Sequence, residues 1–163
     1  LAAAGGVVAS MILMQVIYKK VDLTMALNGA LAGLVSITAE PLTPAPGAAV
    51  LIGAVGGILV VVFVPLLDKL KIDDVVGAIP VHLVAGIWGT LVVPLTNPGA
   101  SFMPQLIGIV AIGVFVFVIS AIVWAVLKFT MGIRVGEEEE ALGLDKTELG
   151  LEAYPEFGGG SQR

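Results

Sequence analysis

The chain has 163 residues, of which 58% are hydrophobic and 13% are charged, and its mean hydropathy is +1.05. Soluble domains carry about 25% charged residues, so this composition excludes an ordinary soluble protein and indicates an integral membrane protein. The net charge of −5 arises in residues 134–163, which hold eight acidic and three basic residues, and it argues against nucleic acid as a partner.

Five apolar segments predict five transmembrane helices. A bilayer core needs roughly 20 apolar residues of helix, and the segments end at charged residues, prolines or glycines. The predicted helices span about 1–18, 23–39, 47–67, 75–95 and 103–129. We therefore expect an all-α polytopic transmembrane bundle over residues 1–131, with Asp74 as the N-cap of the fourth helix, followed by an acidic tail over residues 132–163.

Positively charged residues occur in alternate loops. In the membrane part and at the start of the tail, they follow the first, third and fifth segments: Lys19, Lys20, Lys69, Lys71, Lys128 and Arg134. The loops 40–46 and 96–102 contain no lysine or arginine. The positive-inside rule therefore places the tail in the cytoplasm. Because the chain begins with Leu1 inside an apolar run, we also expect that an N-terminal part is missing.

The only histidine, His82, lies in an uncharged apolar run from Val75 to Leu95. A helix that begins at Asp73 or Asp74 would place His82 roughly 12 Å along its axis, near the centre of the bilayer. An ionisable side chain at that depth usually faces a pore or a partner instead of lipid.

Small residues surround His82 at helical spacing. They are Ala78, Ala85, Gly86 and Gly89. Two interpretations fit this pattern: another helix packs closely against the small face, or the face lines a narrow passage in which imidazole is the polar group. Asn28, the polar residue of the second segment, has the same two alternatives, namely an interhelical hydrogen bond or a position in the pore lining.

The composition offers no catalytic centre. With one histidine, no cysteine and no polar cluster beside His82, the sequence predicts neither a catalytic triad nor a metal site. It also contains no phosphate-binding glycine motif after a predicted strand. We therefore expect a protein that is not an enzyme and needs no cofactor.

Three segments resemble the ammonium transporter family (Amt, with its yeast and Rhesus relatives). They are ALNGALAGLVSITA at 26–39, KIDDVVGAIPVHLVAGIWGTL at 71–91 and GIRVGEEEEALGLDKTELGLEAY at 132–154. Their order and spacing agree with the last part of an Amt chain. Three residues depart from the usual family pattern: Val75 stands in place of proline, Leu83 in place of glycine and Leu149 in place of histidine.

The resemblance implies a fold and a function. The five helices would be the seventh to eleventh of the family, forming the second half of an inverted-repeat transporter that assembles as a homotrimer. His82 would be the second of the paired pore histidines, and Ala78 would line the same lumen. The implied function is transport of ammonium or ammonia across the cell membrane. The alternative is an ammonium sensor on the same scaffold, which a fused or partner-binding tail would favour.

The tail has two interpretations. Its acidic run Glu137–Glu140 is either a solvated segment or part of a docked tail. Docking is favoured by its glycines, by its four leucines and by the basic loop that contains Lys69 and Lys71. The resemblance assigns regulation to Gly132, Arg134 and Thr147, the last at a place where some relatives are phosphorylated. It also implies a PII-type signal protein as the cytoplasmic partner if the source is bacterial.

Overall fold

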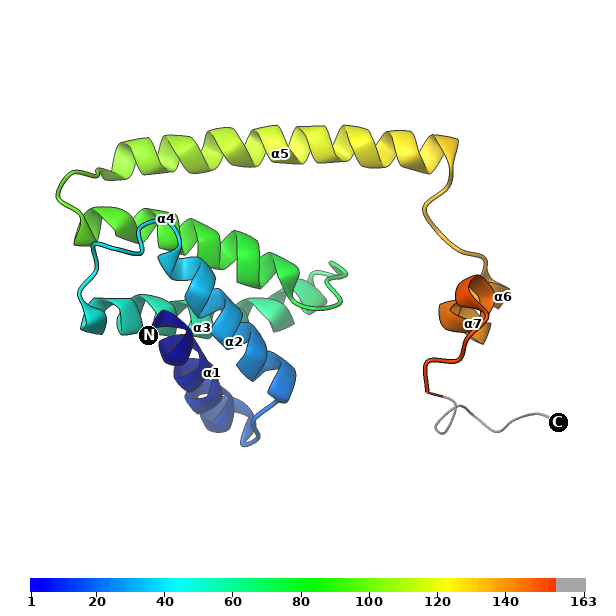
Figure 1. Cartoon of the computed structure of the whole chain (residues 1–163), viewed down its shortest axis with the longest axis horizontal. Helices are drawn as coiled ribbons and strands as arrows, with labels where there is room; N and C mark the ends of the chain where they lie inside the picture. Colours follow the sequence, from blue (N-terminus) through cyan, green and yellow to red (C-terminus); the bar gives the residue numbers. More distant parts are fainter. Residues whose placement is uncertain (155–163) are drawn as a thin grey trace. The chain divides into compact units, whose positions relative to one another are not determined.

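A computed structural model describes residues 1–154 of the chain (Figure 1). The elements are α1 (Ala2–Tyr18), α2 (Leu23–Ile37), α3 (Pro46–Lys69), the π-helix η1 (Ile79–Val84), α4 (Ala85–Thr96), α5 (Phe102–Thr130), α6 (Glu137–Leu142) and α7 (Leu144–Leu149). The described residues contain helices, turns and loops and no strand, which confirms the all-α prediction.

The helices differ in their capacity to cross a membrane. Among the described residues, α3, Ile79–Thr96 and α5 are long and apolar enough to span a bilayer. The helices α1 and α2 are apolar but have 17 and 15 residues, which is short of the roughly 20 that a full crossing needs. That all five segments span the membrane therefore stays a prediction.

The chain divides into two compact units, Leu1–Val114 and Phe115–Arg163. The first unit holds α1 to α4 and the start of α5. The second holds the rest of α5 with α6 and α7. This division falls within α5, between Val114 and Phe115. It therefore does not test the predicted boundary between a membrane domain and a tail at residue 131.

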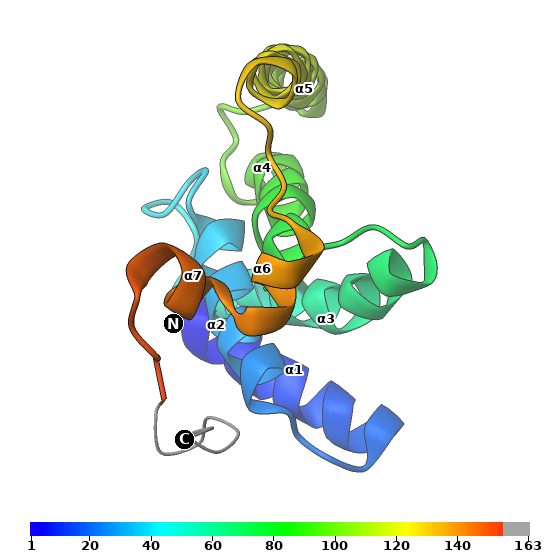
Figure 2. The same ribbon diagram turned by 90° about the vertical axis from the view of Figure 1, so that its right-hand side faces the viewer.

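In the first unit, α1, α2 and α3 pack side by side through glycines (Figures 1 and 2). A Cβ atom added to Gly6 would meet the backbone of Gly29 in α2, and one added to Gly57 of α3 would meet the backbone of Gly6. Gly53 lies in the same way against Ala2. Small residues allow backbones to approach closely in membrane helices, so the glycines of α2 and α3 serve helix packing.

The helices η1 and α4 pack against α2 and α3 through apolar contacts and a hydrogen bond. Val81 and Ala85 are buried in a core with Ala32 of α2 and Val60 of α3. In addition, the indole Nε1 of Trp88 donates to the backbone carbonyl of Ile52 at 3.0 Å. An indole donor needs a partner when it leaves water, so this bond ties α4 to α3 as well as satisfying the donor.

A hydrogen bond between two side chains joins the loop after α2 to the end of α4. The amide Nδ2 of Asn97 donates to Oε2 of Glu40 at 2.9 Å. A hydrogen bond from the Thr43 side chain, followed by the one from Asn97, holds the pKa of the Glu40 carboxyl below its ordinary value. The ionised carboxylate is therefore the form that this loop favours.

In the second unit, α6 and α7 form a small helical pair joined at Gly143. The φ angle of Gly143 is 96°, in a region that side chains rarely adopt. The Asp145 carboxylate accepts the backbone N–H of Ala153 at 2.9 Å, and this bond is the main reason that the pKa of Asp145 lies below its ordinary value. Lys146 forms an ion pair with Glu152 at 3.0 Å. These contacts give residues 136–153 a local structure of their own.

Candidate functional site

The helix that carries His82 begins later than predicted. Residues 75–77 form a turn in which Gly77 has a φ angle of 76°, and η1 begins at Ile79 instead of near residue 75. His82 is therefore the fourth residue of η1, roughly 5 Å from its start at about 1.5 Å per residue. The distance of roughly 12 Å along the helix, counted from Asp73 or Asp74, therefore does not hold, because the turn at residues 75–77 is not helical. The depth of His82 in the bilayer stays a prediction.

Asp74 accepts backbone N–H groups at the start of this helix, although the N-cap residue is Ala78 and not Asp74 as predicted. The backbone N–H groups of Ala78 and Ile79 each donate to one of its carboxylate oxygens at 2.8 Å. The next residue, Pro80, has no N–H to satisfy. The first hydrogen bond within the helix runs from the N–H of Val81 to the carbonyl of Gly77 at 3.1 Å. The donors of the first turn are thus all accounted for.

Asn28 of α2 holds the turn before η1. Its Nδ2 donates to the carbonyl oxygen of Val76 at 2.8 Å, and its side chain is nine-tenths buried. Of the two alternatives for Asn28, the structure shows a hydrogen bond to another segment, although the acceptor lies in a turn and not in a helix. A role of Asn28 in lining a pore stays a prediction.

Two of the four small residues predicted around His82, Ala85 and Gly89, do not share its face. Ala85 is fully buried and Gly89 packs on the backbone of Ser36, whereas His82 and Ala78 are exposed. The assumption of 3.6 residues per turn fails here because the Ala85 N–H bonds to the Pro80 carbonyl, five residues back. A π-turn of this kind is wider than an α-turn and rotates the following residues. The prediction of one small face around His82 is therefore wrong.

Within the first unit, the side chains of His82 and Ala78 are exposed. The described residues also contain no group of three or more histidine, cysteine, aspartate or glutamate side chains that could hold a metal ion. An ionisable side chain on an otherwise apolar helix is costly when it faces lipid, so the position of His82 beside a pore or a partner stays a prediction.

Comparison with known proteins places the chain in a family. The sequence model of the Ammonium Transporter Family matches residues 1–154. The chain belongs to this family. It is 40% identical to the ammonium transporter Amt2 of Archaeoglobus fulgidus, covering 96% of this chain and 38% of the relative. It is 41% identical to the ammonium transporter Amt1 of Haloferax mediterranei, covering 99% of this chain and 32% of the relative.

A solved structure supports the same assignment. A protein titled Sensor Amt Protein matches with a TM-score of 0.84 and 33% identity, over 90% of this chain and 39% of that one. The chain thus spans less than two fifths of the length of these relatives. Family membership and the apolar helices together identify a multi-pass membrane protein.

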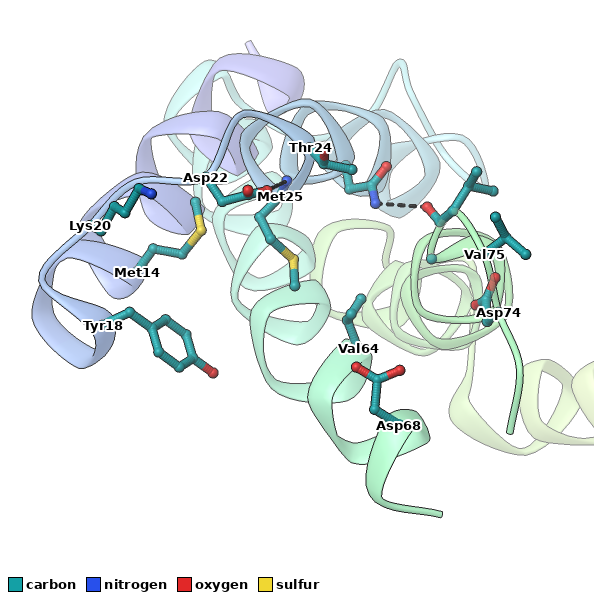
Figure 3. A pocket seen from close by; sticks show the side chains of 13 residues that line it. Met14, Tyr18, Lys20, Asp22, Thr24, Met25, Val64, Asp68, Asp74 and Val75 are labelled. Carbon is teal, nitrogen blue, oxygen red and sulfur yellow. Dashed lines mark hydrogen bonds between the residues drawn. The ribbon is translucent and has the colours of Figure 1, made fainter. Parts of the chain in front are cut away.

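A cleft of about 530 Å³ lies in the first unit of this family member, next to Asn28 (Figure 3). The residues that line it are Met14, Tyr18, Lys20, Asp22, Thr24, Met25, Asn28, Val64, Asp68, Asp74, Val75, Val76 and Gly77. Figure 3 shows three carboxylates around it, on Asp22, Asp68 and Asp74. The walls of this cleft come from segments far apart in the chain, so no local sequence pattern indicates it. His82 is not among its lining residues.

The predicted tail residues have structural partners inside the second unit. Gly132, with a φ angle of 78°, follows the end of α5 as predicted, and its N–H donates to the carbonyl of Leu127 at 3.1 Å. Arg134 forms an exposed ion pair with Glu140 at 2.9 Å. The Thr147 hydroxyl donates to the Gly143 carbonyl at 3.1 Å, and its side chain is exposed. Their regulatory role stays a prediction.

Proposed function

We propose that this chain forms part of a pathway that carries ammonium or ammonia across the cell membrane, and that His82 lines it. Two curated relatives at about 40% identity are named ammonium transporters, which supports the substrate. The observation that carries the site is the exposed imidazole of His82 on an apolar helix that is long enough to span a bilayer. Ala78, exposed one turn earlier, fits the same surface.

The chemistry of imidazole suits this substrate. A cation pays a large solvation cost on entering hydrocarbon, and a narrow apolar passage rejects hydrated ions. A neutral imidazole both donates and accepts a hydrogen bond, so it replaces contacts with water that a small polar molecule loses on entry. This side chain favours a permeation role over an enzymatic one.

The test uses a hybrid protein in which residues 1–163 replace the matching segment of Amt2 from Archaeoglobus fulgidus. We expect this hybrid to take up labelled methylammonium, and His82→Ala to change its uptake or its preference for ammonium over K⁺. Leu83→Ala is the matched control, because Leu83 is the exposed neighbour of His82 and lacks a polar group. Unchanged uptake and selectivity in His82→Ala would show that His82 only packs.

The chain by itself should not transport. The side chain of His82 is exposed, and the chain spans about 38% of the length of a curated relative. We expect residues 1–163 expressed alone to show no saturable uptake of methylammonium. Saturable uptake by this chain would contradict the inference that further protein segments complete the pathway.

Sensing of ammonium is the second candidate function, since the similar solved structure is titled Sensor Amt Protein. The two functions separate by measurement: a transporter shows turnover of labelled substrate across vesicles, and a sensor binds without turnover. We favour transport because the two curated relatives at about 40% identity are both named ammonium transporters.

We also propose a regulatory, cytoplasmic tail in a homotrimer. The alternation of basic loops supports the orientation, and family resemblance supports the trimer and a PII-type partner. Docking of the tail is supported by Leu142, Leu149 and Leu151, which α6 and α7 leave exposed. Crosslinking in native membranes tests the trimer, and protease protection of residues 132–154 tests the side on which the tail lies.

A further inference from the structure

We propose that Asn28 is a positioning residue for His82, acting through its hydrogen bond to the Val76 carbonyl. This assignment rests on the proposed function, in which His82 lines the pathway. It gives Asn28 a role that requires no contact with the substrate. The two residues come from different helices, and the turn at residues 75–77 connects them.

The Val76 carbonyl needs a partner from outside its own segment. It lies before the helix, because the first intrahelical bond is accepted by the Gly77 carbonyl, one residue later. Val76 is exposed and lines the cleft, and a backbone carbonyl that loses contact with water on folding is costly unless it finds a partner. Asn28 supplies the missing donor at 2.8 Å from a side chain that is nine-tenths buried. The bond therefore holds the turn in one geometry.

Gly77 lets the amide approach the start of the helix. A Cβ atom at Gly77 would lie 2.8 Å from Nδ2 of Asn28 and 3.3 Å from Cγ2 of Val64. The turn is thus packed directly against α2 and α3. Since the Gly77 carbonyl accepts the first hydrogen bond of the helix, a shift of this glycine is passed to the residues that follow.

The π-turn is held between two fixed points. At its start, Asn28 and Asp74 secure the turn: Asn28 binds its carbonyl and Asp74 accepts the backbone N–H groups of the first helical turn. At its end, Ala85 is fully buried in the core. π-helical turns are rare and occur mostly as single turns within α-helices, frequently at functional sites. Release of the Val76 carbonyl would leave the hydrogen bonds to Asp74 intact but allow the turn to relax, which would rotate His82.

The experiment measures the orientation of position 82 directly. The chain contains no cysteine, so single thiols report without interference once cysteines of the relative's segment are replaced by serine. His82→Cys and Leu83→Cys are made separately in the hybrid protein, in membranes. The ratio of their labelling rates with a charged methanethiosulfonate reagent describes which of the two neighbours faces water.

Asn28→Leu removes the donor while keeping a branched side chain of similar size. We expect it to change the labelling ratio about fivefold, the population change that corresponds to one net hydrogen bond of about 1 kcal/mol. The matched control is Ser36→Ala, which removes a buried hydrogen bond within α2, from the Ser36 hydroxyl to the Ala32 carbonyl, without touching residues 75–84. We expect this control to leave the ratio unchanged.

The outcomes separate positioning from stability and from the proposed function. An unchanged ratio in folded Asn28→Leu, even with a lower Tm, would overturn the positioning role. If Asn28→Leu does not reach the membrane, Asn28→Ala is measured instead. If neither Asn28 variant folds and reaches the membrane while Ser36→Ala does, the hydrogen bond serves folding alone, which would also overturn the positioning role. An altered ratio combined with normal transport by His82→Ala would refute the proposed function while leaving the structural coupling intact.

Discussion

Replacing Gly57 with alanine is expected to force α3 away from α1. The added methyl group would meet the carbonyl oxygen of Gly6 and would lie 2.8 Å from the carbonyl carbon and 2.9 Å from the Cα atom of that residue. Favourable carbon–carbon contacts lie at about 3.5–4.0 Å, so the helices must separate locally by roughly 0.7 Å. All three atoms belong to the backbone, so rotation of a side chain cannot relieve the clash.

The separation would loosen more than one contact. Gly6 also packs on Gly29 of α2, and Gly53 packs on Ala2 along the same surface of α1. Overpacking of this kind costs about 1–3 kcal/mol, whereas glycine to alanine in a helix gains up to about 1 kcal/mol from intrinsic propensity. We therefore expect a net loss of up to about 2 kcal/mol in the free energy of unfolding.

The assay is thermal unfolding of the detergent-solubilised hybrid protein, with Gly113→Ala as the control. A Cβ atom at Gly113 meets nothing within 4 Å, so this variant experiences the propensity gain without the clash. We expect Gly57→Ala to lower Tm by a few degrees at most, since 1 kcal/mol shifts Tm by about 2–4 °C in domains of 150–250 residues and by less in a larger protein. A Tm for Gly57→Ala at or above that of Gly113→Ala would refute the close-packing argument.

Three further predictions concern polar contacts. Asp74→Ala should lower the free energy of unfolding of the hybrid by about 1–2 kcal/mol. The loss should exceed that of Asp22→Ala, because Asp74 accepts two backbone N–H groups and Asp22 accepts one. Chemical unfolding in urea measures both free energies. Thr147→Asp should reduce methylammonium uptake while Thr147→Ala should not, since added negative charge opposes docking of an already acidic tail; equal uptake by both, at equal membrane levels, would contradict docking at this position. The pKa of Glu40 is lowered by hydrogen bonds from the side chains of Thr43 and then Asn97. These bonds therefore stabilise the fold above the ordinary carboxyl pKa, and their contribution is lost as pH falls through the folded pKa. Acidification should lower Tm more in the parent than in Glu40→Gln, and equal slopes of Tm against pH would show that these bonds do not stabilise the fold.

Several features followed from residue patterns within single segments. The all-α class follows from apolar runs separated by charged or proline-rich loops, and Asp74 is recognisable as an acceptor because a carboxylate before an apolar run accepts the first helical N–H groups. Gly53 and Gly57 indicated a close-packing face, which the structure places against α1. Gly132 indicated the end of α5 because a positive φ angle is easily adopted by glycine. Each signal lies within a few residues of the structure that it predicts.

Other features were decided by tertiary structure. The partner of Asn28 lies 48 residues away, so its sequence context shows a polar residue but not whether it binds a turn or faces a lumen. The prediction of which residues share the face of His82 assumed regular α-helical spacing. The structure instead has a π-turn there, between the turn at residues 75–77 and the buried Ala85. The cleft beside Asn28 is similarly formed by side chains from separate segments. Local sequence determines which elements form, but contacts between distant segments determine their starting residues, their rotation and the surfaces that they leave open.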